Sequence, residues 1–219
     1  MDQKKFKFSH KLLDKYLKQK LDEQKIPFLS TPQISDALKK TIGIQGVIPG
    51  VKAANHHKIF GKLVTAYTKA DDWGTSVQVI DAALPGEVIF IYAEGDNHAV
   101  WGELTSTAAK KKGIAGTIIF GACRDLDAIK NMDYPVFSKK VIPNAGWPRG
   151  DGDININLDC EGTLVKPGDY VVGDDCGVVV IPQSIFKEVM QEAKDIKHLE
   201  KKITKQLENG KTLSEILNL

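Results

Sequence analysis

Runs of hydrophobic residues alternate with amphipathic runs through the middle of the chain. The apolar runs are short and bounded by Gly, Pro or Asp, which is typical of buried strands. The runs between them repeat their apolar positions in steps of three and four, which is typical of helices. The predicted elements are a strand over 56–70, a helix over 75–84, a strand over 87–95, a helix over 102–113, a strand over 114–122 and a loop followed by a polar strand over 144–158.

The strand–helix–strand order of residues 87–120 predicts a crossover unit. Units of this kind place their two strands side by side and parallel in one sheet. Turn residues within 162–182 separate several apolar runs, which predicts a β-meander after the crossover unit. The pattern therefore predicts an α/β fold with a mixed sheet.

Helical patterns occupy both ends of the chain. An apolar stripe predicts a surface helix over 9–24, and a second helix begins near Pro32 with Thr31 as its cap. A long helix is expected over 184–208, followed by a short one with a capping box. With no internal repeat, we expect one domain, divided into three parts: a helical extension (1–30), an α/β core (31–183) and C-terminal helices (184–219).

Composition narrows the functional class. The 219 residues carry a net charge of +2 and are 42% hydrophobic, so a core can form and no long-range attraction to nucleic acid is expected. The charged residues near Met1 lead us to expect no secretory signal, and the apolar runs are too short for us to expect a membrane span. Three widely spaced cysteines make a zinc site unexpected and favour a reducing cytoplasm.

Polar residues follow the buried strands of the crossover unit. Arg124 and Asp125 come directly after one strand, and Glu103 begins the helix that connects the two strands. The carboxyl ends of parallel strands share one edge of a sheet, so we expect Glu103 and Asp125 to be neighbours. Carboxylates are hard oxygen ligands that suit Mg²⁺ or Mn²⁺, and an arginine fork binds a substrate oxygen.

The start of the same helix offers a second kind of contact. The N–H groups of Leu104, Thr105 and Ser106 in its first turn can bind a carboxylate. Together with Arg124, they predict a site for an anionic keto acid chelated to a divalent metal ion.

A simpler interpretation of each residue stays open. An arginine followed by an aspartate at a strand end is, in many proteins, a surface ion pair or part of a turn. Glu103 can act only by its favourable interaction with the positive end of the helix dipole. His98 is expected to be a loop or partly buried histidine, and Cys123 a small buried residue. The two tryptophans at 101 and 147 are expected to pack in the interior or to wall a pocket.

Several motifs in order resemble the family of 4-hydroxy-4-methyl-2-oxoglutarate aldolases, which includes the regulator of ribonuclease E activity A (RraA-like proteins). The resemblance runs from about residue 34 to residue 210. Its motifs are "SDAL" (35–38), "GKLVTA" (61–66), "GELTSTAAKKKGIAGTIIFGACRD" (102–125), "YPVF" (134–137) and "VKPGDYVVGDDCGVVVIP" (165–182).

The resemblance implies a β/β/α swivelling-type fold, assembled as a trimer or a dimer of trimers. It implies a metal-dependent (class II) aldolase that cleaves a 4-hydroxy-2-oxo acid to pyruvate and a second keto acid, with oxaloacetate decarboxylase activity. By position, Asp125 would bind the metal ion and Arg124 would hold the keto oxygen and the enolate. Glu103 would belong to the metal shell and act in proton transfer, in place of the aspartate expected in this family.

The resemblance also implies ligands from two further segments. Gly102 and the helix start at 104–106 would seat the pyruvyl carboxylate. Glu200, from the C-terminal helix of a neighbouring subunit, would complete the metal shell. The alternative implied by the same family is a non-catalytic regulator that binds a ribonuclease or another protein.

Overall fold

A computed structural model describes residues 28–219, so the helix expected over 9–24 lies outside the described residues. The described elements are α2 (Thr31–Ile42), β1 (Lys52–Ala53), β2 (Ile59–Thr68), α3 (Gly74–Ala82), β3 (Val88–Ala93), β4 (Ala99–Trp101), α4 (Glu103–Lys112), β5 (Gly116–Cys123), α5 (Leu126–Lys130), β6 (Val136–Val141), β7 (Asp153–Ile154), β8 (Leu158–Cys160), β9 (Thr163–Val165), β10 (Tyr170–Asp174), β11 (Gly177–Ile181), the 3₁₀ turn η1 (Gln183–Ile185), α6 (Phe186–Glu208) and α7 (Leu213–Leu217).

A mixed sheet forms the centre of the fold. Its strand order is β1-β6-β5-β3-β2-β10-β11, with β4 beside β5 and β7 beside β2. The pairs β2–β3, β3–β5 and β5–β6 are parallel, whereas β10 pairs with β2 and β11 in antiparallel fashion. Val47, shortly before β1, forms a bridge with Val179 of β11, so the two ends of the sheet approach each other.

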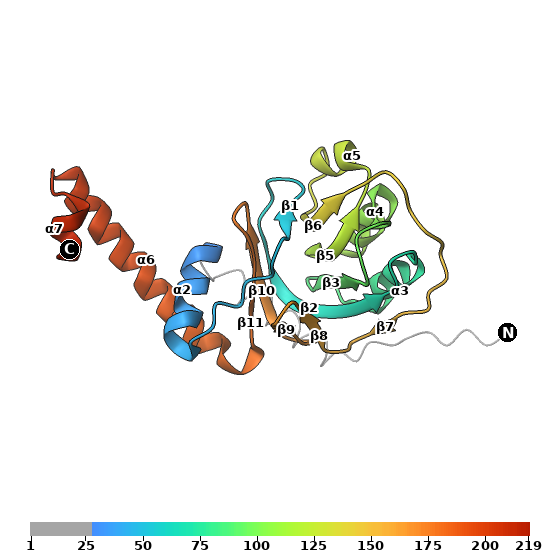
Figure 1. The fold of residues 1–219 in the computed structure, drawn as a ribbon, viewed down its shortest axis with the longest axis horizontal. Helices are drawn as coiled ribbons and strands as arrows, with labels where there is room; N and C mark the ends of the chain where they lie inside the picture. The colour runs from blue at the N-terminus through green and yellow to red at the C-terminus, as the bar shows by residue number, and fades with distance from the viewer. Residues whose placement is uncertain (1–27) are drawn as a thin grey trace.

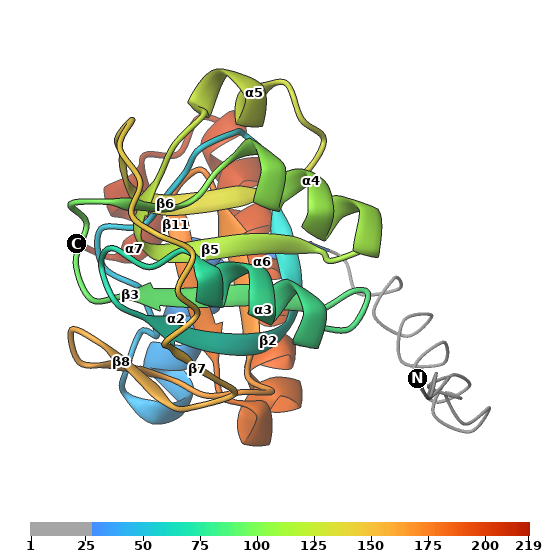
Figure 2. The ribbon, with the colours of Figure 1, turned by 90° about the vertical axis from the view of Figure 1, so that its right-hand side faces the viewer.

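Helices cover the sheet from two sides. Figure 2 shows α3 and α4 in front of the parallel strands, where Ile89 and Ile91 of β3 face them in one apolar cluster. The alternate residues Val88 and Phe90 belong to a second cluster on the opposite face. Beyond β10 and β11, α2 and the first half of α6 form a third layer (Figure 1). With helices or strands on both faces, all eight residues of β5 are buried.

The predicted crossover unit is confirmed, since β3 and β5 pair in parallel on either side of α4. The meander is only partly correct. β10 and β11 form an antiparallel hairpin, but β9 pairs with β8 in a separate two-stranded sheet. Turn residues show where a strand ends but not which strand it pairs with. The sequence pattern therefore does not show that β9 pairs with the preceding strand β8 and not with β10.

The cap of α2 differs by one residue from the prediction. Ser30 is the N-cap and forms a capping box with Gln33, while Thr31 lies inside the helix. Thr31 is used elsewhere: its N–H and hydroxyl donate to the carboxylate of Asp174 at 2.9 and 2.6 Å. Asp174, which is buried, also accepts from the N–H of Cys176 at 3.0 Å, so it joins α2 to the β10–β11 turn.

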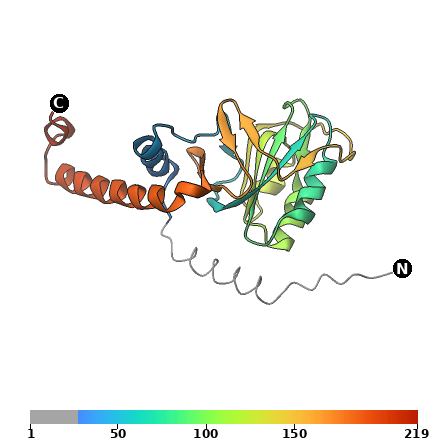
Figure 3. The ribbon, with the colours of Figure 1, turned by 90° about the horizontal axis from the view of Figure 1, so that it is seen from below.

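Helix α6 extends well beyond the core, as Figures 1 and 3 show. Its 23 residues span roughly 34 Å at the usual helical rise. Val189, Met190 and Ala193 in its first half are buried against α2 and the β10–β11 hairpin. Further along the same apolar stripe, Leu199 is 58% exposed and Leu207 is 40% exposed. The described residues therefore leave Leu199 and Leu207 uncovered, whereas Ile196 and Ile203 are half-buried.

Within residues 28–219, no helix has both the length and the apolar character needed to cross a membrane.

Replacement of Asp174 by Asn should destabilise the fold. The amide would keep one acceptor oxygen, but its NH₂ group would face N–H and hydroxyl groups that now donate hydrogen bonds to the carboxylate. We expect the free energy of unfolding to fall by about 1–3 kcal/mol in a denaturant titration.

The neighbouring residue provides the control. Asp175 pairs with His56 at 2.9 Å, but both side chains are largely exposed. Asp175→Asn should therefore leave the unfolding midpoint almost unchanged. Equal midpoints for the two variants would contradict the role given to Asp174.

Candidate active site at the carboxyl edge of the sheet

The crossover unit brings Glu103 and Asp125 together. Strand β5 ends at Cys123, and short strand β4 lies beside that end, so Gly102 and the first turn of α4 adjoin Arg124 and Asp125. The N–H of Arg124 donates to the carbonyl of Trp101 at 2.9 Å, and the N–H of Glu103 donates to Asp125 Oδ2 at 3.0 Å. The predicted neighbours are therefore joined through the backbone of α4.

Asp125 has an unusual backbone conformation. Its φ is 58°, in the left-handed region that few non-glycine residues adopt, and it stands just before α5. A Cβ atom at position 102 would overlap Asp125 Oδ2, so only glycine allows this approach. The Arg124 Nε atom lies 3.5 Å from the same oxygen, and the two side chains are 43% and 36% exposed. Both charged groups therefore remain accessible to a small ligand.

The start of α4 presents donors of two kinds. Ser106 is buried, and its N–H and hydroxyl both donate to the carbonyl of Gly102, while the hydroxyl also accepts from Trp101 Nε1 at 2.8 Å. Its polar groups thus support the turn. Within the described chain, no hydrogen bond involves the N–H groups of Leu104 and Thr105, which leaves them for an anion.

A small cavity lies against these groups. Its volume is about 120 Å³. The lining residues are Trp73, Ala99, Val100, Trp101, Gly102, Leu104, Thr105, Arg124, Asp125 and Ala145. The cavity thus combines one charged corner with apolar walls, and it can hold an organic acid of a few carbon atoms.

Two of the walls were not predicted from the sequence. Trp73 follows the carboxyl end of β2, which reaches the same edge because β2 pairs in parallel with β3. The stretch "TKADDWG" (68–74) at that strand end was the signal available for Trp73. Ala145 belongs to a loop without periodicity, and nothing in its sequence marks it as part of a site.

The two glutamates expected in the metal shell lie on different helices, Glu103 at the start of α4 and Glu200 on α6. Glu103 is exposed; its main-chain N–H contacts Asp125, but Glu103 is not among the residues that line the cavity. Glu200 lies on α6 and accepts from Gln33 Nε2 of the same chain at 2.6 Å. Among residues 28–219, no three His, Cys, Asp or Glu side chains gather closely enough to hold a metal ion. One chain thus brings the backbone of Glu103 to Asp125, and the metal-binding roles expected of Glu103 and Glu200 stay predictions.

The remaining candidates near the edge are as expected, apart from Trp147. His98 is partly buried, and Trp101 is 2% exposed and also walls the cavity. Trp147 is 66% exposed, so the expectation that it packs in the interior is wrong. Cys123 is buried, with its sulfur 3.2 Å from the hydroxyl of Ser138.

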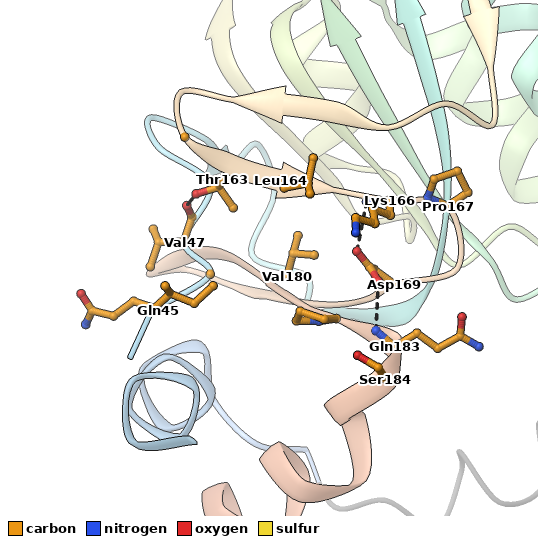
Figure 4. A pocket seen from close by; sticks show the side chains of 14 residues that line it. Gln45, Val47, Thr163, Leu164, Lys166, Pro167, Asp169, Val180, Gln183 and Ser184 are labelled. Carbon is orange, nitrogen blue, oxygen red and sulfur yellow. Dashed lines mark hydrogen bonds between the residues drawn. The ribbon is translucent and has the colours of Figure 1, made fainter. Parts of the chain in front are cut away.

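A larger groove lies away from this edge, between β9, the segment before β1 and the start of α6 (Figure 4). Its volume is about 900 Å³. The carboxylate of Asp169 accepts from the N–H groups of Lys166 and Gln183 at 3.0 and 2.9 Å, so it holds the walls of the groove together. No arginine or histidine occurs among the described residues that line this groove. The groove is larger than the small cavity, but it has no counterpart of the pair Arg124 and Asp125.

Comparison with known proteins identifies the class. Residues 31–180 match the RraA-like family, described as Aldolase/RraA, and the chain therefore belongs to this family. An uncharacterized protein of Methanocaldococcus jannaschii is 39% identical over 192 residues, which cover 87% of this chain and 90% of that protein.

Two further relatives connect the family to an activity and to a solved fold. A protein of Halalkalibacterium halodurans, named as a candidate 4-hydroxy-4-methyl-2-oxoglutarate aldolase, is 35% identical over 76% of this chain and 79% of its own length. The crystal structure of an uncharacterized protein from Pseudomonas syringae pv. tomato superimposes with a TM-score of 0.76. The two sequences are 30% identical, and the match covers 85% of this chain and 92% of the other. The predicted family and fold class are confirmed.

The environments of the cysteines predict their reactivity. Burial raises the pKa of the Cys123 thiol, and it raises that of Cys160 to about 12, whereas Cys176 is exposed. At pH 8, both buried thiols should remain protonated and inaccessible. We expect one thiol per chain to react rapidly with an aromatic disulfide reagent in the native protein, and three after denaturation.

The variant Cys176→Ser should remove the rapid phase in the native protein and leave two thiols after denaturation. Rapid native reaction of Cys123 would instead indicate an accessible, activated thiol beside Arg124.

Proposed function

We propose that this protein is a divalent-metal-dependent pyruvate-enolate lyase. It cleaves a 4-hydroxy-2-oxo acid of the 4-hydroxy-4-methyl-2-oxoglutarate type to pyruvate and a second keto acid, and it also decarboxylates oxaloacetate. The observation that carries this proposal is the meeting of Arg124, Asp125 and the start of α4 at one cavity of about 120 Å³. The name of the Halalkalibacterium halodurans relative supports the same activity.

The donor atoms at this corner suit a hard cation. The carboxylates of Asp125 and Glu103 would hold Mg²⁺ or Mn²⁺, since these ions prefer oxygen ligands. Because the described chain gathers no third ligand there, the proposal assigns that place to Glu200 of a neighbouring subunit. When bound, the ion supplies a Lewis acid for the keto oxygen of the substrate.

Arg124 and the first turn of α4 orient the substrate. The Arg124 guanidinium donates to the keto oxygen and stabilises the negative charge that develops there. One donor fixed in this way contributes about 3 kcal/mol to the transition state. The N–H groups of Leu104 and Thr105 receive the neighbouring carboxylate, helped by the positive end of the helix dipole.

Both reactions break the same bond. The electrons of the C3–C4 bond remain on the pyruvyl fragment as an enolate, whether C4 leaves as a keto acid or as carbon dioxide. In the aldol case the C4 hydroxyl also loses a proton, and Glu103 accepts or relays it. A proton is then returned to C3 to give pyruvate.

The remaining expectations concern partners and location. The ligand is a small keto acid, and the proposal includes neither nucleic acid nor a membrane as partner. The free thiols of Cys123, Cys160 and Cys176 support a location in a reducing cytoplasm.

The direct test is pyruvate release from 4-hydroxy-4-methyl-2-oxoglutarate and from oxaloacetate, measured with and without Mg²⁺. We expect an excess of EDTA to abolish turnover, and Mg²⁺ or Mn²⁺ to restore it, because the carboxylates alone cannot stabilise the enolate. Activity unchanged by the chelator would contradict the metal. Absence of turnover with either substrate in Mg²⁺ would favour the non-catalytic regulator.

The exposed stripe on α6 supports an assembly with shared sites. Leu199 and Leu207 lie uncovered on a helix that extends beyond its own core, and contiguous exposed apolar surface often marks an interface. Glu200 lies on the same stretch. We therefore propose a homotrimer or a dimer of trimers in which each α6 helix reaches the site of the next subunit.

Mixed oligomers test this arrangement. Asp125→Ala and Glu200→Ala subunits are each expected to be inactive alone, but refolded together they should regain part of the activity. A site that takes Asp125 from the Glu200→Ala subunit and Glu200 from the Asp125→Ala subunit is then intact. The pair Asp125→Ala with Arg124→Ala is the control and should not recover, because both residues belong to the same chain at each site. A monomeric mass with full activity, or no recovery in verified mixed oligomers, would rule out shared sites of this kind.

A further inference from the structure

Asp72 is a buried acid that the proposed chemistry does not use. It lies four residues beyond the end of β2 and is 0% exposed. Its carboxylate accepts from the N–H groups of Gly74, Arg149, Gly150 and Asp151, at distances of 2.7 to 3.0 Å. One side chain therefore ties the start of α3 to a loop more than seventy residues later.

The same two segments are joined around this carboxylate by the backbone. The N–H of Trp147 donates to the carbonyl of Asp71 at 2.7 Å, and the N–H of Trp73 donates to the carbonyl of Trp147 at 3.1 Å. The indole of Trp73 donates to the carbonyl of Gly146 at 3.1 Å. A Cβ atom at position 146 would overlap Asp71, so the loop lies directly on the segment that carries Asp72. The two segments pack as one unit.

This unit forms part of the cavity that holds Arg124 and Asp125. Trp73 comes directly after Asp72, and Ala145 lies directly before the loop residues that contact Asp71 and Trp73. Both side chains line the cavity. A change in the position of the loop would therefore alter the apolar wall while Arg124, directly after β5, stays in place.

The charge on Asp72 suits this structural role. Burial alone would raise its pKa, but the hydrogen bonds from Gly150, Asp151, Gly74 and Arg149 more than offset burial and hold the pKa below its usual value. A group with a lowered pKa in the folded state stabilises the fold above its unfolded pKa, and this contribution is lost as the pH falls through the lower value. The carboxylate is therefore charged, and the loop is held, at neutral and mildly acidic pH.

We propose that Asp72 is a positioning residue that holds the Trp73–Ala145 wall and thereby sets how tightly the site binds its small keto acid. The inference rests on the proposed function, because the wall acts on the substrate of that reaction. Since the wall contacts the substrate before and during reaction, its displacement should weaken binding more than it slows the chemical step.

The test compares Asp72→Asn with the wild type in oxaloacetate decarboxylation with Mg²⁺. The amide would point a donor at N–H groups that need an acceptor, so the loop should detach. We expect KM to rise at least tenfold while kcat changes less than threefold. Trypsin should also cleave after Arg149 at least tenfold faster, because the N–H of Gly150 is no longer held.

Asp174→Asn is the matched control. Asp174 is likewise buried and accepts main-chain N–H groups, but it lies at the β10–β11 turn and joins that turn to α2. This variant should melt earlier than the wild type and keep the wild-type KM and the wild-type cleavage rate after Arg149. An equal rise in KM for both variants would show that lost stability, and not the wall, changes binding.

A milder variant covers the case in which Asp72→Asn does not fold. The Thr75 hydroxyl accepts from the N–H of Gly152 at 3.0 Å and lies 3.5 Å from Asp72 Oδ2. Thr75→Val removes both contacts without changing the charge, and we expect a KM increase of about threefold with cleavage after Arg149 accelerated.

The outcomes separate the two proposals. If Asp72→Asn and Thr75→Val are both cleaved faster and both keep a normal KM, the positioning role is overturned and the proposed function is left intact. A wild type with no turnover and no pyruvate binding in Mg²⁺ would overturn the proposed function, and the positioning role with it.

Discussion

The parallel pairing of β3 with β5 is the constraint on which the site depends. Because the two strands run in the same direction, α4 must run back between them, and its first turn lies at the edge where β5 ends. The positive end of one helix thus meets the residues that follow a buried strand. Asp125 accepts from the N–H of Glu103, and Gly102 leaves room for this contact. The charged corner of the cavity follows from this topology.

Buried carboxylates join distant parts of the chain at two other places. Asp72 binds a loop more than seventy residues later, and Asp174 binds the start of α2, which lies 143 residues earlier. A buried charge is costly unless its hydrogen bonds are satisfied, so each carboxylate fixes the donors around it. One of the two attachments lies beside the cavity and the other lies far from it. The same interaction therefore shapes a binding wall in one place and only the fold in the other.

The parts of the fold that could be predicted are those with local signals. Periodicity gave the crossover unit and α6, and the order of strand and helix was sufficient to place Glu103 next to Asp125. Contacts between distant segments could not be predicted in this way. Ser30 and Thr31 are both good capping residues; the capping box with Gln33 selects Ser30, and the bond from Thr31 to Asp174, which no local pattern shows, uses Thr31 elsewhere. Trp73 joins the site because β2 pairs with β3. Ala145 joins it because a loop without periodicity pairs with Ala99 at one residue and with Asp72 at another.

The measurement that tests the central claim most directly is hydrogen exchange at C3 of pyruvate. In heavy water, a protein that forms the pyruvate enolate replaces the methyl protons by deuterium, and proton NMR follows their loss without any need for the natural substrate. With Mg²⁺, the account predicts exchange well above the rate in buffer, and a rate about a hundredfold lower for Arg124→Lys, which loses the planar donor fork. Exchange no faster than in buffer, or an equal rate for the Arg124→Lys variant, would contradict an enolate held at Arg124.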